Sequence, residues 1–302
     1  KNCYMMQSIS SENTPIHIPV LKKEVISFLD IQPDGIYVDG TCGLGGHSKI
    51  ILKNLSTKGT LISIDVDEKA LNICKNSLNN GLKKIYIKKN SYSNLPVILK
   101  EMDITKVTGI LLDLGLSSLQ LDSDNRGFSY KNNCHLDMRF DQSEKTTAAE
   151  LINNSTQSEL ADIIYYNGEE RRSRAIAKKM TQSLPIDNVQ ELVNAITSCT
   201  PPHKRNRTIA RVFQAFRIAL NNELGRLSEF LSSYIDYLEK GGKIVIISFH
   251  SLEDRLVKRN FKDFSKNGLL KILTKKPIMA SDEEVNANRR SKSAKLRCAQ
   301  KI

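Results

Sequence analysis

The chain has 302 residues, of which 40% are hydrophobic and 26% charged, and its formal net charge is +12 at pH 7. This composition is typical of a folded globular protein and excludes a disordered chain, and no run reaches the roughly 18 apolar residues that a membrane helix needs. The six cysteines form no CxxC pair and the five histidines no HxxxH or HxH pair. We therefore expect no metal site, no membrane partner and a reducing, bacterial-type cytoplasmic location.

The first segment, 1–16, is polar and lacks the apolar run of a secretory signal. We expect it to be disordered or extended. Because the sequence begins with Lys1 rather than Met, a preceding targeting segment, and with it an organellar location, is left open.

Helices and strands are then predicted to alternate. Apolar residues at helical spacing behind Pro19 indicate an amphipathic helix over 19–30, and two more helical segments follow at 46–55 and 67–79. The short apolar runs that predict strands are 35–39, 59–65, 83–89, 107–113 and 242–249. Strands that alternate with helices in this way form parallel βαβ units, so the predicted fold class is α/β with a Rossmann-like, doubly wound sheet.

The alternation stops between about Ser118 and Pro202. Thr147 with Glu150, and Thr156 with Glu159, have the spacing of capping boxes that begin helices, and a further helix is predicted at 188–199. A long amphipathic stretch from about Thr208 then leads to a helix stop at Gly241 and Gly242. These features predict an all-helical, substrate-recognising domain at 119–205, inserted into a discontinuous sheet domain formed by 17–118 and 206–302.

Positive charge is concentrated in two segments. Residues 255–302 carry a net charge of +10, and residues 201–217 hold five Lys and Arg and no acid. Localised positive charge is typical of a surface that binds a polyanion such as RNA. The alternative is a Lys-rich surface that only keeps the chain soluble.

The stretch VDGTCGLGGHSKIIL, residues 38–52, places four glycines between a predicted strand and a predicted helix. Such a turn lets backbone N–H groups approach a ligand. A nicotinamide-binding GxGxxG turn needs a third glycine where Ser48 stands. Asp39, followed by Gly43 and Gly45, instead resembles motif I of class I S-adenosylmethionine methyltransferases, with Thr41 in place of its first glycine.

Two further residues suit a bound nucleoside. Asp65 ends the second predicted strand, where a carboxylate can accept hydrogen bonds from both ribose hydroxyls. Tyr92 follows the third strand, where an aromatic face can lie against adenine, although a half-buried core tyrosine is the alternative. Asp67 is expected to cap the next helix.

Longer strings occur in order along nearly the whole chain and together resemble the ribosomal RNA small subunit methyltransferase H family. They include GLGGH (43–47), DLGLSSLQLD (113–122), RGFSY (126–130), LDMRFD (136–141), FQAFRIALNNEL (213–224) and ISFHSLEDRLVK (247–258). The resemblance implies a class I methyltransferase fold with an inserted helical domain. It also implies methyl transfer from S-adenosylmethionine to the exocyclic 4-amino group of one cytidine in the decoding region of 16S rRNA.

The resemblance further implies the site residues and partners. Carried over position by position, the cofactor contacts are Gly45, Gly46, His47, Asp65, Tyr92, Asp113 and Gln120. The expected partner is 16S rRNA within an assembled or assembling small ribosomal subunit, and a homodimer is left open.

The candidates for the catalytic step are Asp113 and Asp137, either of which has a structural alternative. An Asp beside Arg139 is more often an ion pair than a catalyst. His250 follows the last predicted strand and could touch the base or the RNA backbone, and Ser251 with Asp254 has the spacing of a capping box.

Two functions of other classes compete with this interpretation. One is a dehydrogenase that binds a nicotinamide cofactor through the same turn, and Ser48 counts against it. The other is a non-catalytic RNA-binding assembly factor with a vestigial cofactor site. The presence of Asp65, Asp113 and the glycine turn argues against such decay.

Overall fold

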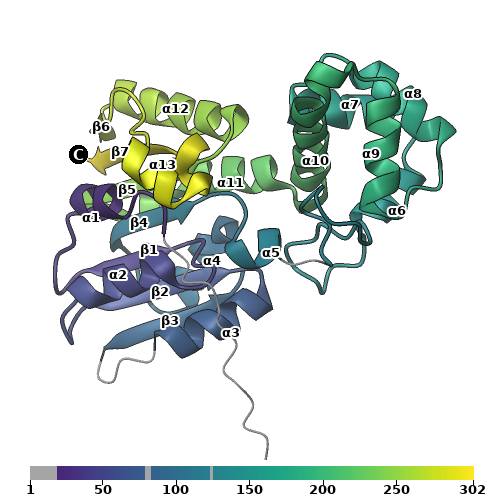
Figure 1. The fold of residues 1–302 in the computed structure, drawn as a ribbon. Coiled ribbons are helices and arrows are strands. Elements are labelled where there is room, and N and C mark those ends of the chain that lie inside the picture. The colour runs from purple at the N-terminus through teal and green to yellow at the C-terminus, as the bar shows by residue number, and fades with distance from the viewer. Residues whose placement is uncertain (1–18, 79–82, 123–124) are drawn as a thin grey trace, which may run out of the picture.

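Seven strands form one sheet in the computed structural model, which describes residues 19–78, 83–122 and 125–302 (Figure 1). In spatial order they are β3 (Lys84–Lys89), β2 (Thr60–Asp65), β1 (Ile36–Asp39), β4 (Val107–Asp113), β5 (Leu238–Ser248), β7 (Lys295–Lys301) and β6 (Leu270–Ile272). Strands β1 to β5 pair in parallel, and β7 pairs antiparallel with both of its neighbours. The strand order reverses between β1 and β4, where ligands bind in open sheets of this kind. The predicted α/β class with a doubly wound sheet is confirmed.

Helices cover both faces of the sheet because its central strands are apolar on both faces. Successive residues of β4 show this: Ile110 and Leu112 pack into one core and Leu111 into the other, all fully buried. The helices on the first face are α4 (Leu95–Glu101), α11 (Glu223–Tyr237) and α12 (Ser251–Lys266). Those on the second are α1 (Lys22–Leu29), α2 (Gly46–Asn54) and α3 (Glu68–Ser77).

A separate group of helices stands beside the sheet (Figure 1). It contains α6 (Ala148–Asn154), α7 (Gln157–Gly168), α8 (Ser173–Gln182), α9 (Val189–Ser198) and α10 (Arg205–Asn221). Helices α6 and α7 each begin with a capping box, so the predicted pairs Thr147–Glu150 and Thr156–Glu159 are confirmed. Short elements complete the chain: α5 (Ser118–Asp122), α13 (Asp282–Ala287), and the 3-10 turns η1 (Tyr92–Asn94), η2 (Pro202–Lys204) and η3 (Arg289–Ser293).

The helical group extends past the boundary predicted at residue 205. Val212, Phe213 and Phe216 of α10 are buried in its core together with Leu160 and Ile164 of α7. Because α10 continues the 3.6-residue apolar pattern into that core, its packing places it with the insertion rather than with the sheet. The predicted segment 1–16 lies outside the described residues.

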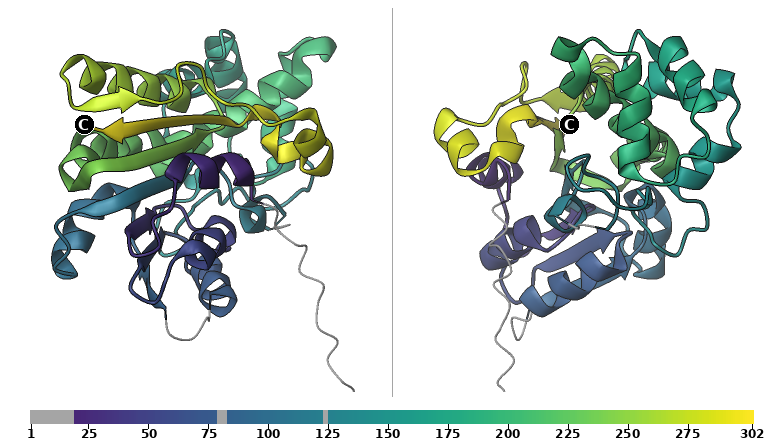
Figure 2. Two further views of the ribbon diagram at one scale, coloured as in Figure 1. Left: turned by 90° about the vertical axis from the view of Figure 1, so that its left-hand side faces the viewer. Right: turned by 45° about the vertical axis from the view of Figure 1, so that its right-hand side comes forward.

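The C-terminal part of the sheet differs from the prediction. Strands β6 and β7 were not predicted, and β7, drawn in gold in Figure 2, lies beside β5. Helix α11 ends at Tyr237 rather than at Gly241, because the chain enters β5 there and the two glycines lie in an irregularity of that strand. Among the described residues, every helix is too short or too polar to span a lipid bilayer.

Candidate active site

A cavity of about 400 Å³ opens at the carboxyl ends of the parallel strands, next to the reversal between β1 and β4. Its volume is typical of a small-molecule site. One wall consists of the loops after β1, β2, β3 and β4, and the other is formed by the end of β5 and parts of α10, α11 and α12. Six of the seven predicted cofactor contacts line it, namely Gly46, His47, Asp65, Tyr92, Asp113 and Gln120, and Gly45 does not.

Asp39 and Ser48 join the first strand to the first helix. Asp39 is fully buried at the end of β1, and its Oδ2 accepts a hydrogen bond of 2.6 Å from Ser48 Oγ. Ser48 Oγ also lies 2.8 Å from Ser63 Oγ on β2. Burial raises the pKa of Asp39, and the Ser48 hydrogen bond opposes that shift. The residue that stands in place of a third glycine thus fastens α2 to both strands.

The glycine turn is shaped by backbone geometry and close packing. Gly43 and Gly45 both have positive φ, of 49° and 87°. A Cβ on Gly45 would lie 2.9 Å from Ser77 Oγ and 3.0 Å from Cys74 Sγ, both on α3. Only a glycine lets the start of α2 approach α3 so closely in this conformation. The turn places the adjoining residue, Gly46, at the edge of the cavity.

Asp65 is held at the cavity by backbone N–H groups. Its Oδ2 accepts from Gly43 N at 2.8 Å and its Oδ1 from Asp67 N at 2.9 Å. Burial raises the pKa of Asp65 to about 6, although both hydrogen bonds favour the ionised form. The glycine turn and the second strand therefore meet at one carboxylate.

His47 and Asp113 face each other across the turn, with Nε2 and Oδ2 3.4 Å apart. Burial alone would lower the pKa of His47, but Asp113 and then Asp39 outweigh it and raise that pKa. Within the described residues, both ring nitrogens of His47 and Oδ1 of Asp113 are buried and make no hydrogen bond. Buried polar atoms are usually satisfied, so this part of the wall fits a polar ligand.

Gln120 and Arg126 converge on Asp67. As predicted, Asp67 caps α3, accepting from Lys69 N at 3.1 Å. Its other oxygen accepts from Gln120 Nε2 at 3.3 Å and from Arg126 Nη1 at 2.5 Å, and Arg126 and Asp67 are each 2% exposed. Sequence reasoning missed this role of Arg126, although the RGFSY string contains it. The buried ion pair ties the loop that precedes the helical group to the sheet.

Tyr92 lies between the two walls of the cavity. Its ring meets Phe230 of α11 edge-on, with the centroids 5.7 Å apart. Burial raises the pKa of its hydroxyl, and the carboxylates of Glu253 and Glu223 add to the shift. Tyr92 thus borders acidic groups of the far wall as well as the strand ends.

Asp137 is engaged by Arg139 through both carboxylate oxygens, at 2.7 and 2.8 Å. Burial would raise the pKa of Asp137, but the hydrogen bonds and charge of Arg139 lower it. Asp137 is also not among the residues that line the cavity. This geometry favours the ion-pair interpretation over a catalytic role.

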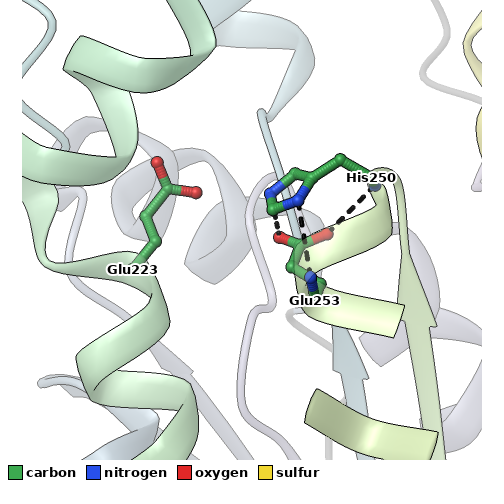
Figure 3. A group of neighbouring side chains, drawn as sticks. All are labelled: Glu223, His250 and Glu253. Atoms are coloured by element: carbon green, nitrogen blue, oxygen red, sulfur yellow. Dashed lines mark hydrogen bonds and ion pairs between the residues drawn. The ribbon is translucent and has the colours of Figure 1, made fainter. Parts of the chain in front are cut away.

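The far wall carries buried charged side chains (Figure 3). Glu223, the first residue of α11, accepts from Arg217 Nε and Nη2 at 2.8 and 3.0 Å. Opposite it, His250 Nε2 lies 3.2 Å from Glu253 Oε1. Glu223, His250 and Glu253 bring one potential ligand atom each within 4.8 Å of one another, an arrangement that the sequence did not predict. Because Arg217 donates to both oxygens of Glu223, a cation bound there would meet an adjacent positive charge.

The predicted capping box of α12, Ser251 with Asp254, is wrong. The N-cap is His250, whose Nδ1 accepts from Glu253 N while the Glu253 carboxylate accepts from His250 N. Ser251 instead donates to Glu169, and Asp254 pairs with Arg297 at 2.7 Å. Imidazole nitrogen can accept a hydrogen bond as a serine hydroxyl does, so the capping box lies one residue earlier than expected.

The two basic segments differ in the structure. Lys204, Arg205 and Arg207 are exposed at the start of α10. In the C-terminal segment Arg297 is 6% exposed and lies on β7, so it belongs to the core and not to a polyanion-binding surface. Other cations of that segment are exposed, among them Lys258, Arg259 and Lys262 of α12 and Arg289 and Lys292 of η3.

Comparison with known proteins gives one consistent result. The model of the MraW methylase family matches residues 14–302. Proteins named ribosomal RNA small subunit methyltransferase H are 46% identical in Thermosipho africanus and Caldicellulosiruptor saccharolyticus, over 95% of this chain and 98% and 99% of theirs. The protein of that name in Crocosphaera subtropica is 45% identical over 95% of this chain and 89% of its own.

Proposed function

Because the chain belongs to the MraW methylase family, we propose that it methylates the exocyclic N4 amino group of one cytidine in the decoding region of 16S rRNA. The chain is a methyltransferase, and its cofactor is S-adenosylmethionine. The observation that carries the proposal is identity of 45–46% over 95% of the chain to relatives named for methylation of small-subunit rRNA.

The residues of the strand-end wall suit this cofactor. When bound, it supplies a methyl group activated by a positively charged sulfur. We assign Gly45, Gly46 and His47 to its methionine end and Asp65 to its ribose hydroxyls, because a carboxylate can accept both. Tyr92, Asp113 and Gln120 complete the contacts. The buried, unsatisfied nitrogens of His47 and Oδ1 of Asp113 are the atoms that a polar ligand would satisfy.

Asp113 is the proposed catalytic residue. The amino group of cytosine is a poor nucleophile because its lone pair is delocalised into the ring. An acceptor that holds its N–H groups favours a pyramidal nitrogen, and positioning supplies much of the rate. Asp113 ends β4 and lines the cavity, and its backbone N–H is fixed by Thr41 Oγ1 at 2.6 Å. Asp137 is not part of this proposal.

The exposed basic residues of 201–207 are proposed to contact phosphates of the RNA. Such contacts give affinity that depends on salt and carry little sequence information, which leaves the choice of base to the cavity. The target base must leave its stack to reach the cofactor. We propose that the substrate is the assembled or assembling small subunit in the cytoplasm.

The test is incubation of small subunits from a strain lacking this methylation with labelled S-adenosylmethionine, followed by nucleoside analysis. We expect label on a cytidine amino group. Asp113→Asn should lower the rate of transfer at least tenfold, whereas Asp162→Asn, at an exposed position of α7, should not. Label on any other atom or base would overturn the proposal.

A further inference from the structure

The far wall of the cavity holds polar groups that the proposed cofactor contacts do not use. His250 and Glu253 begin α12 directly after β5, and Glu223 begins α11 on the opposite side (Figure 3). All three line the same cavity as the strand-end wall. His250 and Glu253 follow β5, which is separated by β4 from the strands β1 and β2 that carry the glycine turn and Asp65.

His250 presents a hydrogen-bond donor to the cavity. Its Nδ1 accepts from Glu253 N at 3.4 Å, so in the neutral ring the hydrogen is on Nε2. The side chain is 8% exposed, and within the described part of the chain Nε2 makes no hydrogen bond. Glu253 Oε1 lies 3.2 Å away as an ion-pair partner but without hydrogen-bond geometry, so this buried donor is available to an acceptor that a ligand supplies.

Glu253 presents an acceptor beside that donor. Its Oε2 accepts from the backbone N–H groups of Phe249 and His250, at 2.9 and 3.4 Å, which fixes the carboxylate. Its Oε1 lies 3.2 Å from His250 Nε2. Burial would raise the pKa of Glu253, but His250 and Arg217 outweigh it and keep the carboxylate ionised. A fixed donor and a fixed acceptor thus lie side by side.

This pair matches one edge of cytosine. Cytosine presents the acceptor N3 next to the amino donor N4, whereas uracil presents the donor N3–H next to the acceptor O4. We propose that His250 Nε2 donates to N3 and that Glu253 accepts from N4, so that the pair selects an aminopyrimidine over uracil. The inference rests on the proposed function and names the residues that bind its target base.

Glu223 and Arg217 complete the wall. Arg217 balances the negative charge of Glu223 through two hydrogen bonds, and the Glu223 carboxylate faces the space in front of His250 and Glu253 (Figure 3). It offers an acceptor for the second N–H of the amino group. The paired guanidinium disfavours a divalent cation at this place, so the base fits the wall better than a metal does.

His250→Asn is the decisive variant. Asparagine is among the preferred N-cap residues, so the cap of α12 is kept while the Nε2 donor is lost. The measurement is the affinity of the enzyme, bound to S-adenosylhomocysteine, for small subunits with either cytidine or uridine at the methylated position. His135→Asn, at an exposed position, is the matched control.

The wild type and His135→Asn should bind the cytidine subunits at least fivefold more tightly than the uridine subunits. His250→Asn should reduce that ratio below twofold, with its affinity for S-adenosylhomocysteine within twofold of the wild type. Glu253→Gln should also lower the ratio, because its amide can donate to O4 of uracil.

Three outcomes would overturn the inference. If His250→Asn kept the wild-type ratio of cytidine to uridine affinity, this inference would be wrong and the proposed function would stand. The cluster would be a metal site instead if a chelator abolished methyl transfer by the wild type and a divalent cation restored it. In that case His250→Asn should need a higher cation concentration for the same rate. A wild type that places no label on cytidine would overturn the proposed function and the inference together.

Discussion

The two walls of the cavity are built in different ways. The strand-end wall is made of tight backbone turns, with Gly43 and Gly45 at positive φ and Asp65 held by backbone N–H groups. The far wall is made of buried charged side chains that hold one another, chiefly Arg217 with Glu223. The first wall therefore tolerates few changes of shape, whereas the second tolerates few changes of charge.

The largest expected effect comes from unbalancing the far wall. The side chains of Arg217 and Glu223 are 13% and 9% exposed. Burial would lower the pKa of Arg217, but the charge of Glu223 and its hydrogen bonds outweigh burial and raise it. Arg217→Met leaves a buried carboxylate without its partner, which destabilises by about 3–5 kcal/mol. Urea unfolding followed by circular dichroism measures the loss.

Two variants separate charge balance from lost packing. Replacing both partners, as Arg217→Met with Glu223→Leu, should recover most of the stability, because a pair replaced by apolar residues is often neutral. Lys243→Met breaks a pair whose partner, Asp30, is 62% exposed, and should cost only about 0–1 kcal/mol. A double variant as unstable as Arg217→Met would show that charge is not the cause.

A smaller effect is expected from crowding the strand-end wall. Gly45→Ala and Gly241→Ala both place a side chain at positive φ, 87° and 82°, which costs roughly 1–2 kcal/mol. Only at Gly45 does the new Cβ also meet neighbouring atoms, since nothing lies within 4 Å at Gly241. Gly45→Ala should weaken S-adenosylhomocysteine binding at least tenfold by calorimetry, and Gly241→Ala less than twofold. Equal losses would contradict the role of close packing.

The same contrast explains what the sequence could predict. Turns and strands leave local signals: glycine spacing, apolar runs and an acid at a strand end located Asp39, Asp65 and the glycine turn between them. In the far wall the sequence singled out His250 but not the charges around it, because Arg217, Glu223 and Glu253 come from three helices and only the tertiary fold brings their charges together.

Strand β7 was missed for a related reason. Its sequence KLRCAQK has charges at both ends and in the middle, as an exposed basic tail would. The buried Arg297 donates two hydrogen bonds to Asp254, 43 residues earlier, and a partner at that distance is not visible in a local pattern.

The smallest expected effect is a pH dependence of cofactor binding that arises in the strand-end wall. Burial raises the pKa of Asp65 to about 6, so the carboxyl is increasingly protonated as the pH falls through that value. Only the ionised form can accept hydrogen bonds from both ribose hydroxyls through both oxygens. Affinity for S-adenosylhomocysteine should therefore be flat above pH 7 and fall about tenfold per pH unit well below 6.

Asp65→Asn is the matched variant for that titration. Its amide oxygen can still accept from the backbone, but it does not ionise, so its weaker binding should not change between pH 5 and 7. The measurement is calorimetric titration of both proteins with S-adenosylhomocysteine across this range. If Asp65→Asn kept the wild-type slope, the titrating group would be His47 or Asp39, whose pKa values are also raised, and the assignment of Asp65 to the ribose would lose this support.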